Sequence, residues 1–150
     1  MVEDIRVPFP NNDADFASFF SVFTHLLHEE TYCYLREARR VVKPAGLIVF
    51  SFLEFEHNWK VFEDACRGVR DGRPNVHLNT FMGRDAIQVW AHHLGMTIVD
   101  IRAGPERFIN LAVPVVHDNG ERTEGCAALG QSICVLRNDK VRGDKRKAVS

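Results

Sequence analysis

Residues 29–53, EETYCYLREARRVVKPAGLIVFSFL, carry the pattern of a helix followed by a strand. In the first half of this stretch, charged residues fill one side of a helical pattern. Apolar side chains recur at helical spacing on the other side, at Tyr34, Leu35, Ala38, Val41 and Val42. Glutamates open this helix and arginines close it, as the helix dipole prefers. Residues 43–46, Lys-Pro-Ala-Gly, stop the helix, and the apolar run 47–53 predicts a strand buried on both faces.

A second apolar run precedes the helix. Residues 15–23, DFASFFSVF, are aromatic and apolar, and they follow the turn-forming residues 10–13. We expect this run to be another strand buried on both faces. Strand, helix and strand with a short break predict a right-handed βαβ unit with parallel strands.

The remaining elements continue the α/β pattern. Apolar residues at helical spacing predict helices over 59–69 and 84–94, the second ending at Gly95. Residues 97–102 and 131–137 predict two further strands. Residues 103–130 contain four glycines and two prolines, and we expect a long loop or hairpin arm there.

Composition indicates one soluble globular domain. The chain has 150 residues, 45% of them hydrophobic, and a formal net charge of -1. We expect a single domain over 1–138 and a basic, disordered tail over 139–150. The net charge implies no nucleic-acid or membrane partner, and the chain has neither a 20-residue apolar run nor a signal core, so a cytoplasmic location is expected.

Cysteine and histidine spacing gives no metal signature. The four cysteines include no C-x-x-C pair, so reduced, mostly packed thiols are expected. The one close histidine pair, His92 and His93, would point to different sides of a helix. We therefore expect no metal site.

Three blocks of sequence resemble those of class I S-adenosylmethionine-dependent methyltransferases. The blocks are VPFPNNDAD at 7–15, SVFTHL at 21–26 and EARRVVKPAG at 37–46, against the family forms LPFPDGSFD, SVLEHL and EXXRVLKPGG. The segment GMTIV at 95–99 also resembles the start of the family's sixth strand. The resemblance implies an α/β fold, a Rossmann-like sheet that is mostly parallel with an antiparallel last strand and helices on its faces, and S-adenosylmethionine as cofactor.

The glycine-rich G-x-G-x-G loop of this family is absent, and the chain resembles only the C-terminal half of such an enzyme. In the family's strand order, 3-2-1-4-5-7-6, the run 15–23 would lie beside the missing first strand. Its second edge would then be bare, and natural proteins cover such edges. We therefore expect a truncated methyltransferase that forms a homodimer through this edge or binds a separate N-terminal half.

The resemblance also implies cofactor-binding positions. Glu3, Asp4 and Ile5 match the acidic loop that binds the adenine, although a frayed terminus explains the first two equally well. Phe20, Ser21 and Val22 match the segment that passes the cofactor's sulfonium and amino group. Both groups would lie at the carboxyl ends of strands, where doubly wound sheets bind ligands.

Acceptor-site candidates follow the same strands. His25 could act as a general base towards a hydroxyl or amine, or it could only hydrogen-bond a neighbouring loop. Phe23 is a candidate pocket wall, with the core as the alternative. Glu54, Glu56 and His57 follow the next strand and would face an acceptor, unless they form a solvated loop.

Two classes of function remain open. The first is a methyltransferase acting on a small molecule or sugar, assembled with a missing half or as part of a longer gene product. The alternative is a catalytically inactive, methyltransferase-like interaction module, which the absent glycine loop favours. A nucleotide-binding domain of another chemistry is disfavoured, because the chain contains neither G-x-x-x-x-G-K-[ST] nor G-x-G-x-x-G.

Overall fold

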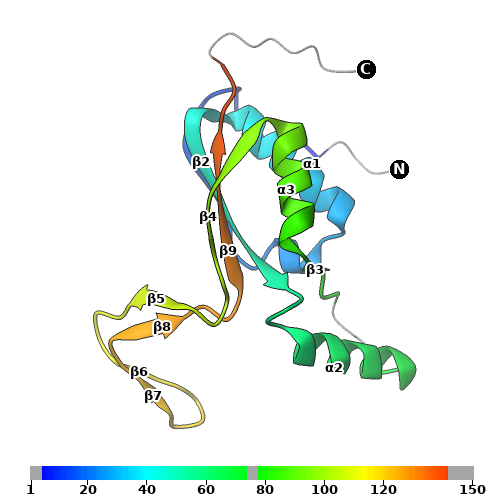
Figure 1. Cartoon of the computed structure of the whole chain (residues 1–150), viewed down its shortest axis with the longest axis vertical. Coiled ribbons are helices and arrows are strands. Elements are labelled where there is room, and N and C mark those ends of the chain that lie inside the picture. The colour runs from blue at the N-terminus through cyan, green and yellow to red at the C-terminus, as the bar shows by residue number, and fades with distance from the viewer. Residues whose placement is uncertain (1–4, 74–77, 142–150) are drawn as a thin grey trace.

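A computed structural model describes residues 5–73 and 78–141, in which a small sheet lies beside the helices (Figure 1). Glu3 and Asp4, and most of the predicted tail, lie outside the described residues. The helices are η1 (Phe23–His25), α1 (His28–Val41), α2 (Trp59–Arg70) and α3 (Arg84–Leu94). The strands are β1 (Ala14–Phe19), β2 (Val42–Glu54), β3 (Phe81–Met82), β4 (Met96–Arg102), β5 (Arg107–Asn110), β6 (Val115–Val116), β7 (Arg122–Thr123), β8 (Cys126–Ala128) and β9 (Ser132–Asn138).

The main sheet has the order β1-β2-β9-β4, and the short β3 pairs in parallel with the carboxyl end of β2. β1 and β2 are parallel, with Phe16 opposite Leu47, so the predicted parallel pairing is confirmed. β9 is antiparallel to both of its neighbours. The predicted α/β class, with an antiparallel last strand, is therefore confirmed.

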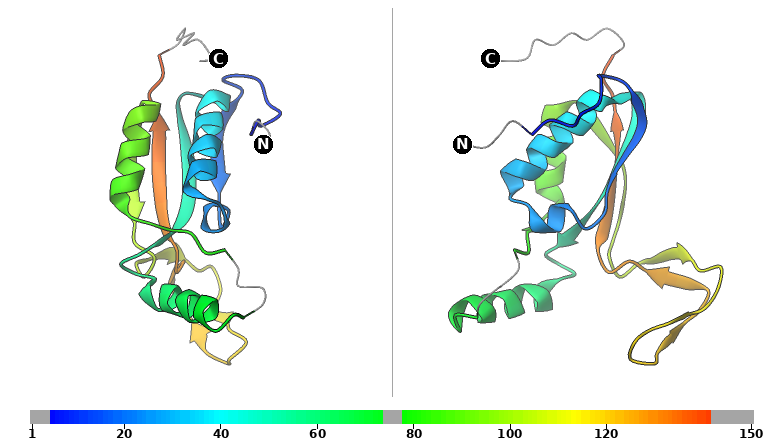
Figure 2. Two further views of the ribbon diagram at one scale, coloured as in Figure 1. Left: turned by 90° about the vertical axis from the view of Figure 1, so that its right-hand side faces the viewer. Right: turned by 180° about the vertical axis from the view of Figure 1, so that it is seen from behind.

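Both α1 and α3 pack on the same face of this sheet, and they enclose the core (Figure 2). Alternate residues of β2 point into it, namely Ile48, Phe50 and Phe52, all fully buried. Leu35 of α1 and Ile87 of α3 meet these side chains and are equally buried. Among the described residues, the opposite face of the sheet carries no helix.

That opposite face is apolar and uncovered in the described part of the chain. Phe16 is 52% exposed and Val99 is 53% exposed. Val49 of β2 lies opposite Val135 of β9, and both are only half-buried. An apolar sheet face of this kind normally packs against another layer.

The expectation of a strand over 15–23, buried on both faces, is wrong. β1 ends at Phe19, and Phe23 already lies in η1. Within the described ranges β1 pairs with β2 only, and its residues are exposed or half-buried. The strand is exposed because nothing described lies on its outer edge or over its second face.

Side chains satisfy the ends of α1. At the first turn, the carboxylate of Glu30 accepts the backbone N–H of Leu27 at 2.8 Å. At the last turn, the fully buried Asn138 of β9 donates its amide to the carbonyls of Arg39 and Val42, at 2.9 and 2.8 Å. Free helix carbonyls need such partners, and these bonds fix α1 to the sheet.

Two segments extend beyond the layered body at the same end of the sheet (Figure 2). One is α2, which buries only Gly68 completely and contacts the body through aromatic side chains such as Phe62. The other is the expected arm over 103–130, built from the short hairpin ladders β5–β8 and β6–β7. Both leave the body where β1 and β2 have their carboxyl ends.

The expected break over residues 43–46 lies inside β2, and an alanine there adopts a conformation that favours glycine. Ala45 has φ +67° and is exposed. The adjacent Gly46 is required for space, because a Cβ there would lie 2.6 Å from the carbonyl oxygen of Asp15. The family form KPGG has glycine at both positions.

Ala45→Gly is expected to stabilise the protein by about 0.5–1 kcal/mol. A left-handed backbone costs a non-glycine residue about 1–2 kcal/mol, and glycine removes this cost. Glycine also gives the unfolded chain more conformational freedom, which cancels part of the gain in stability. Chemical denaturation measures the change. Ala38→Gly, inside α1, is the control with the opposite sign, and a loss of stability in both variants would contradict the backbone argument.

No helix among the described residues is long and apolar enough to cross a membrane.

The four cysteines are free thiols. Burial raises the pKa of the Cys134 thiol to about 12, which makes this side chain a packed core residue and a poor nucleophile.

Candidate functional site at the carboxyl ends of β1 and β2

The chain turns sharply after β1. Phe20 is 51% exposed, Val22 is 39% exposed, and Ser21 between them has φ +55°, in the left-handed region. The backbone N–H of Ser21 donates to Oγ of the fully buried Ser51 on β2, at 2.8 Å. Strained non-glycine residues of this kind cluster at functional sites, and this one lies in the segment where the family resemblance implies cofactor binding.

Phe23 and His25 follow in η1, and they face different surroundings. Phe23 is fully buried, with its ring 4.8 Å from that of Phe19 and 5.2 Å from that of Phe50, so it is a core residue with no free surface for a ligand. His25 is exposed, and its Nδ1 lies 2.8 Å from the carbonyl oxygen of Leu78. When Nδ1 donates that bond, the neutral ring keeps an unprotonated Nε2.

Glu54 ends β2 and is only 4% exposed. Arg84, at the start of α3, donates to its carboxylate through Nε at 2.5 Å and Nη2 at 3.2 Å. The hydroxyl of Ser132 donates to the same carboxylate at 2.7 Å. Burial alone raises the pKa of the Glu54 carboxyl, but the hydrogen bonds from Arg84 and Ser132 outweigh it, so the pKa lies below its usual value.

Glu56 and His57 are exposed in the turn after β2. His57 Nε2 lies 3.6 Å from Glu54, and ligand atoms of all three residues lie within 4.8 Å of one another. The carboxylate of Glu54 is already bound by Arg84 and Ser132. We therefore interpret this cluster as an ion-pair network and not as a set of metal ligands.

The segment before β1 is held against α1. Arg40 donates to the carbonyls of Val7 and Phe9, each at 2.9 Å, and it pairs with Glu37. Glu37 in turn accepts the backbone N–H of Val7 at 3.1 Å. Two of the sequence blocks, 7–15 and 37–46, are thus joined in space, and the clamp fixes the chain two residues after the half-buried Ile5.

The structure adds residues that the sequence analysis did not single out. Ser51, Gln131 and Ser132 bind the ends of β1 and β2, and Arg84 neutralises Glu54. These side chains come from strands and a helix that are distant in sequence. No local motif marks them, and only the strand order brings them together.

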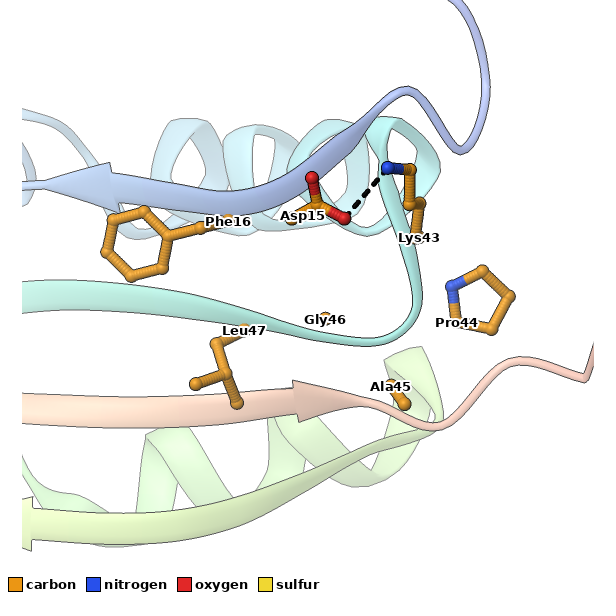
Figure 3. A pocket seen from close by; sticks show the side chains of 7 residues that line it. All are labelled: Asp15, Phe16, Lys43, Pro44, Ala45, Gly46 and Leu47. Carbon is orange, nitrogen blue, oxygen red and sulfur yellow. Dashed lines mark hydrogen bonds and ion pairs between the residues drawn. The ribbon is translucent and has the colours of Figure 1, made fainter.

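An open hollow of about 340 Å³ lies at the opposite end of the sheet (Figure 3). Phe16 and Leu47 line it together with Lys43, which pairs with Asp15 at 2.7 Å. It lies at the amino ends of β1 and β2, whereas ligands of doubly wound sheets bind at the carboxyl ends. We therefore place the candidate site at the other end.

The strand order β1-β2-β9-β4, with β9 antiparallel, reproduces the 4-5-7-6 part of the class I methyltransferase sheet. A family model confirms the resemblance to class I S-adenosylmethionine-dependent methyltransferases. Residues 1–50 match the family model described as a methyltransferase domain. No curated protein matches the chain significantly.

Solved structures share the fold at low sequence identity. A methyltransferase from Methanosarcina mazei is 14% identical with a TM-score of 0.54, over 87% of this chain and 62% of that one. A possible histamine N-methyltransferase from Thermotoga maritima is 13% identical with a TM-score of 0.56, over 90% and 60%. A putative methyltransferase of Haloferax volcanii, in complex with the Trm112 activator, is 11% identical with a TM-score of 0.55, over 89% and 58%. This chain thus spans about three fifths of the length of each.

Proposed function

We propose that this chain is the C-terminal half of an S-adenosylmethionine-dependent methyltransferase that acts on a small molecule or sugar. The observation that carries the proposal is the antiparallel β9 between β2 and β4, combined with the methyltransferase-domain match over the first 50 residues. Methyl transfer from a sulfonium needs positioning more than acid-base help, and the turn after β1 offers a fixed, partly exposed backbone for it.

The cofactor-binding residues in this proposal are those of two segments. Phe20–Val22 would pass the sulfonium and amino group, and Glu3, Asp4 and Ile5 would bind the adenine. The Arg40–Glu37 clamp supports the second assignment, because it fixes the chain next to Ile5. S-adenosylmethionine supplies an electrophilic methyl group, and the chain's own residues would hold the donor and exclude water.

His25 is the proposed general base for a hydroxyl or amine acceptor. Its exposed ring and the bond from Nδ1 to the Leu78 carbonyl favour a tautomer in which Nε2 is free to take a proton. Among the acceptor-side candidates, Glu56 and His57 are exposed in the turn after β2. Glu54 would act indirectly, by holding Arg84 and Ser132 in place.

The proposed partner is a polypeptide that covers the outer edge of β1 and the bare face of the sheet. A second copy is the simplest occupant when the chain is alone, and a separate N-terminal half is the other. The only charged side chain of β1 is Asp15, which is paired with Lys43, so charge does not oppose self-pairing. The Haloferax volcanii complex is a precedent for a methyltransferase of this fold with a protein partner.

Calorimetric titration with S-adenosylhomocysteine tests the proposal. Because this product needs no acceptor, saturable binding is expected if the chain or its dimer completes the site. Ser21→Pro is the matched variant, since proline excludes the φ of +55° and removes the N–H that Ser51 accepts. Absence of binding by the wild-type chain would favour the catalytically inactive interaction module, which the uncovered apolar face supports.

A further inference from the structure

We infer that Gln131 is a positioning residue that holds the turn Phe20–Val22 in the shape required for cofactor binding and joins it to the base of the arm. The inference rests on the proposed function. Gln131 directly precedes β9, more than a hundred residues after the turn that it contacts. Neither the sequence blocks nor the family resemblance assigns it a role.

The hydrogen bonds form a closed ring of three residues: Ser21 after β1, Ser51 in β2 and Gln131 just before β9. Ser51 accepts the N–H of Ser21 and donates its own hydroxyl to Oε1 of Gln131, at 2.6 Å. Nε2 of Gln131 donates to Oγ of Ser21 at 3.1 Å. Each polar atom in the ring therefore has a partner, and the amide of Gln131 alone spans both serines.

This ring offsets the strain at Ser21. A left-handed serine has to be held by its surroundings, and Gln131 holds both the hydroxyl of Ser21 and the acceptor of its N–H. Without the glutamine amide, Ser51 loses its acceptor and can rotate away. The turn then relaxes, and Phe20 and Val22 lose their fixed places.

The same ring connects the turn to the neck of the arm. The N–H of Gly130, adjacent to Gln131, donates to the carbonyl of Gly104 at 3.0 Å. The two chain segments that enter and leave the arm touch at Gly104 and Gly130, because a Cβ on Gly104 would lie 2.5 Å from the Gly130 oxygen. A ligand or partner that moves the arm would therefore move Gln131, and through it the turn after β1.

Gln131→Met keeps the length of the side chain and removes its hydrogen bonds with Ser21 and Ser51. Amide hydrogen exchange is expected to be at least about tenfold faster at Ser21, whereas the amides of the β2–β9 ladder keep their wild-type rates. Affinity for S-adenosylhomocysteine is expected to fall about tenfold. Gln131→Glu retains an acceptor for Ser51 and should keep most of the protection of Ser21, which separates hydrogen bonding from packing.

Gln88→Met is the matched control, because Gln88 is exposed on α3, and it should change neither measurement. Unchanged exchange at Ser21 in Gln131→Met would overturn the inference, as would faster exchange with unchanged affinity. If the wild-type chain does not bind S-adenosylhomocysteine while exchange at Ser21 still rises in the variant, the proposed function fails and the structural part of the inference holds.

Discussion

Glu54→Gln is expected to lower the free energy of unfolding by about 2–3 kcal/mol. The variant keeps the size of the side chain but removes a buried negative charge that Arg84 and Ser132 both bind. Breaking a fully buried pair costs about 3–5 kcal/mol, and we expect less because the side chain of Arg84 is 42% exposed. Urea denaturation at neutral pH measures the difference.

The effect of this substitution should depend on pH. The pKa of Glu54 is lower in the folded protein than its ordinary value of 4.5, so the folded state favours the ionised carboxylate. Its stabilising contribution is therefore complete well above pH 4.5 and is lost as the pH falls through the folded pKa. We expect the wild-type and Glu54→Gln stabilities to converge in acid.

Glu56→Gln is the control for both measurements, because Glu56 is exposed in the turn two residues after Glu54. Its stability should change by less than about 0.5 kcal/mol. A similar loss in the two variants, or a difference between wild type and Glu54→Gln that persists at low pH, would contradict the assigned role of the buried carboxylate.

Ser18→Lys is expected to weaken self-association of the chain at least about tenfold. Ser18 is exposed on β1, whose outer edge pairs with no strand in the described residues. A lysine on an edge strand is a common natural barrier to edge-to-edge pairing. Sedimentation or light scattering over a concentration series gives the dissociation constants.

Ser18→Thr adds bulk without charge and is expected to associate like the wild type. Gln88→Lys places the same charge on α3, away from β1, and should also have no effect. A wild-type chain that stays monomeric at high concentration would contradict self-pairing and would leave the N-terminal half as the partner. Equal association of Ser18→Lys and wild type would place the contact elsewhere.

Local patterns predicted α1 and α3 well, because their boundaries have local causes. The 3.6-residue repeat marks α1, and Gly95 ends α3 with φ +61°. The predicted break over 43–46 is wrong, because β2 already begins at Val42, five residues before the expected strand 47–53. The end of β1 was placed four residues too late, because the apolar run 15–23 continues through Ser21, whose left-handed backbone leaves no mark in hydropathy.

The candidate site was predicted only where it lies in the first 57 residues. Phe20–Val22 and His25 lie at the expected strand end, whereas Phe23 turns into the core because η1 rotates it towards Phe50. The sequence analysis did not assign Gln131 and Ser132 to the site, because their roles depend on β9 lying beside β2. Pairing between distant segments is a tertiary property that single-sequence patterns do not encode.

The proposed cofactor site lies at the carboxyl end of β1. Backbone amide chemical shifts recorded during titration with S-adenosylhomocysteine test it most directly, with adenosine as a weaker reference ligand. We predict saturable shifts concentrated at Ile5 and Phe20–Val22, with little change around Lys43 at the other end of the sheet. Absence of saturable shifts, or shifts confined to the hollow near Lys43, would contradict the claim.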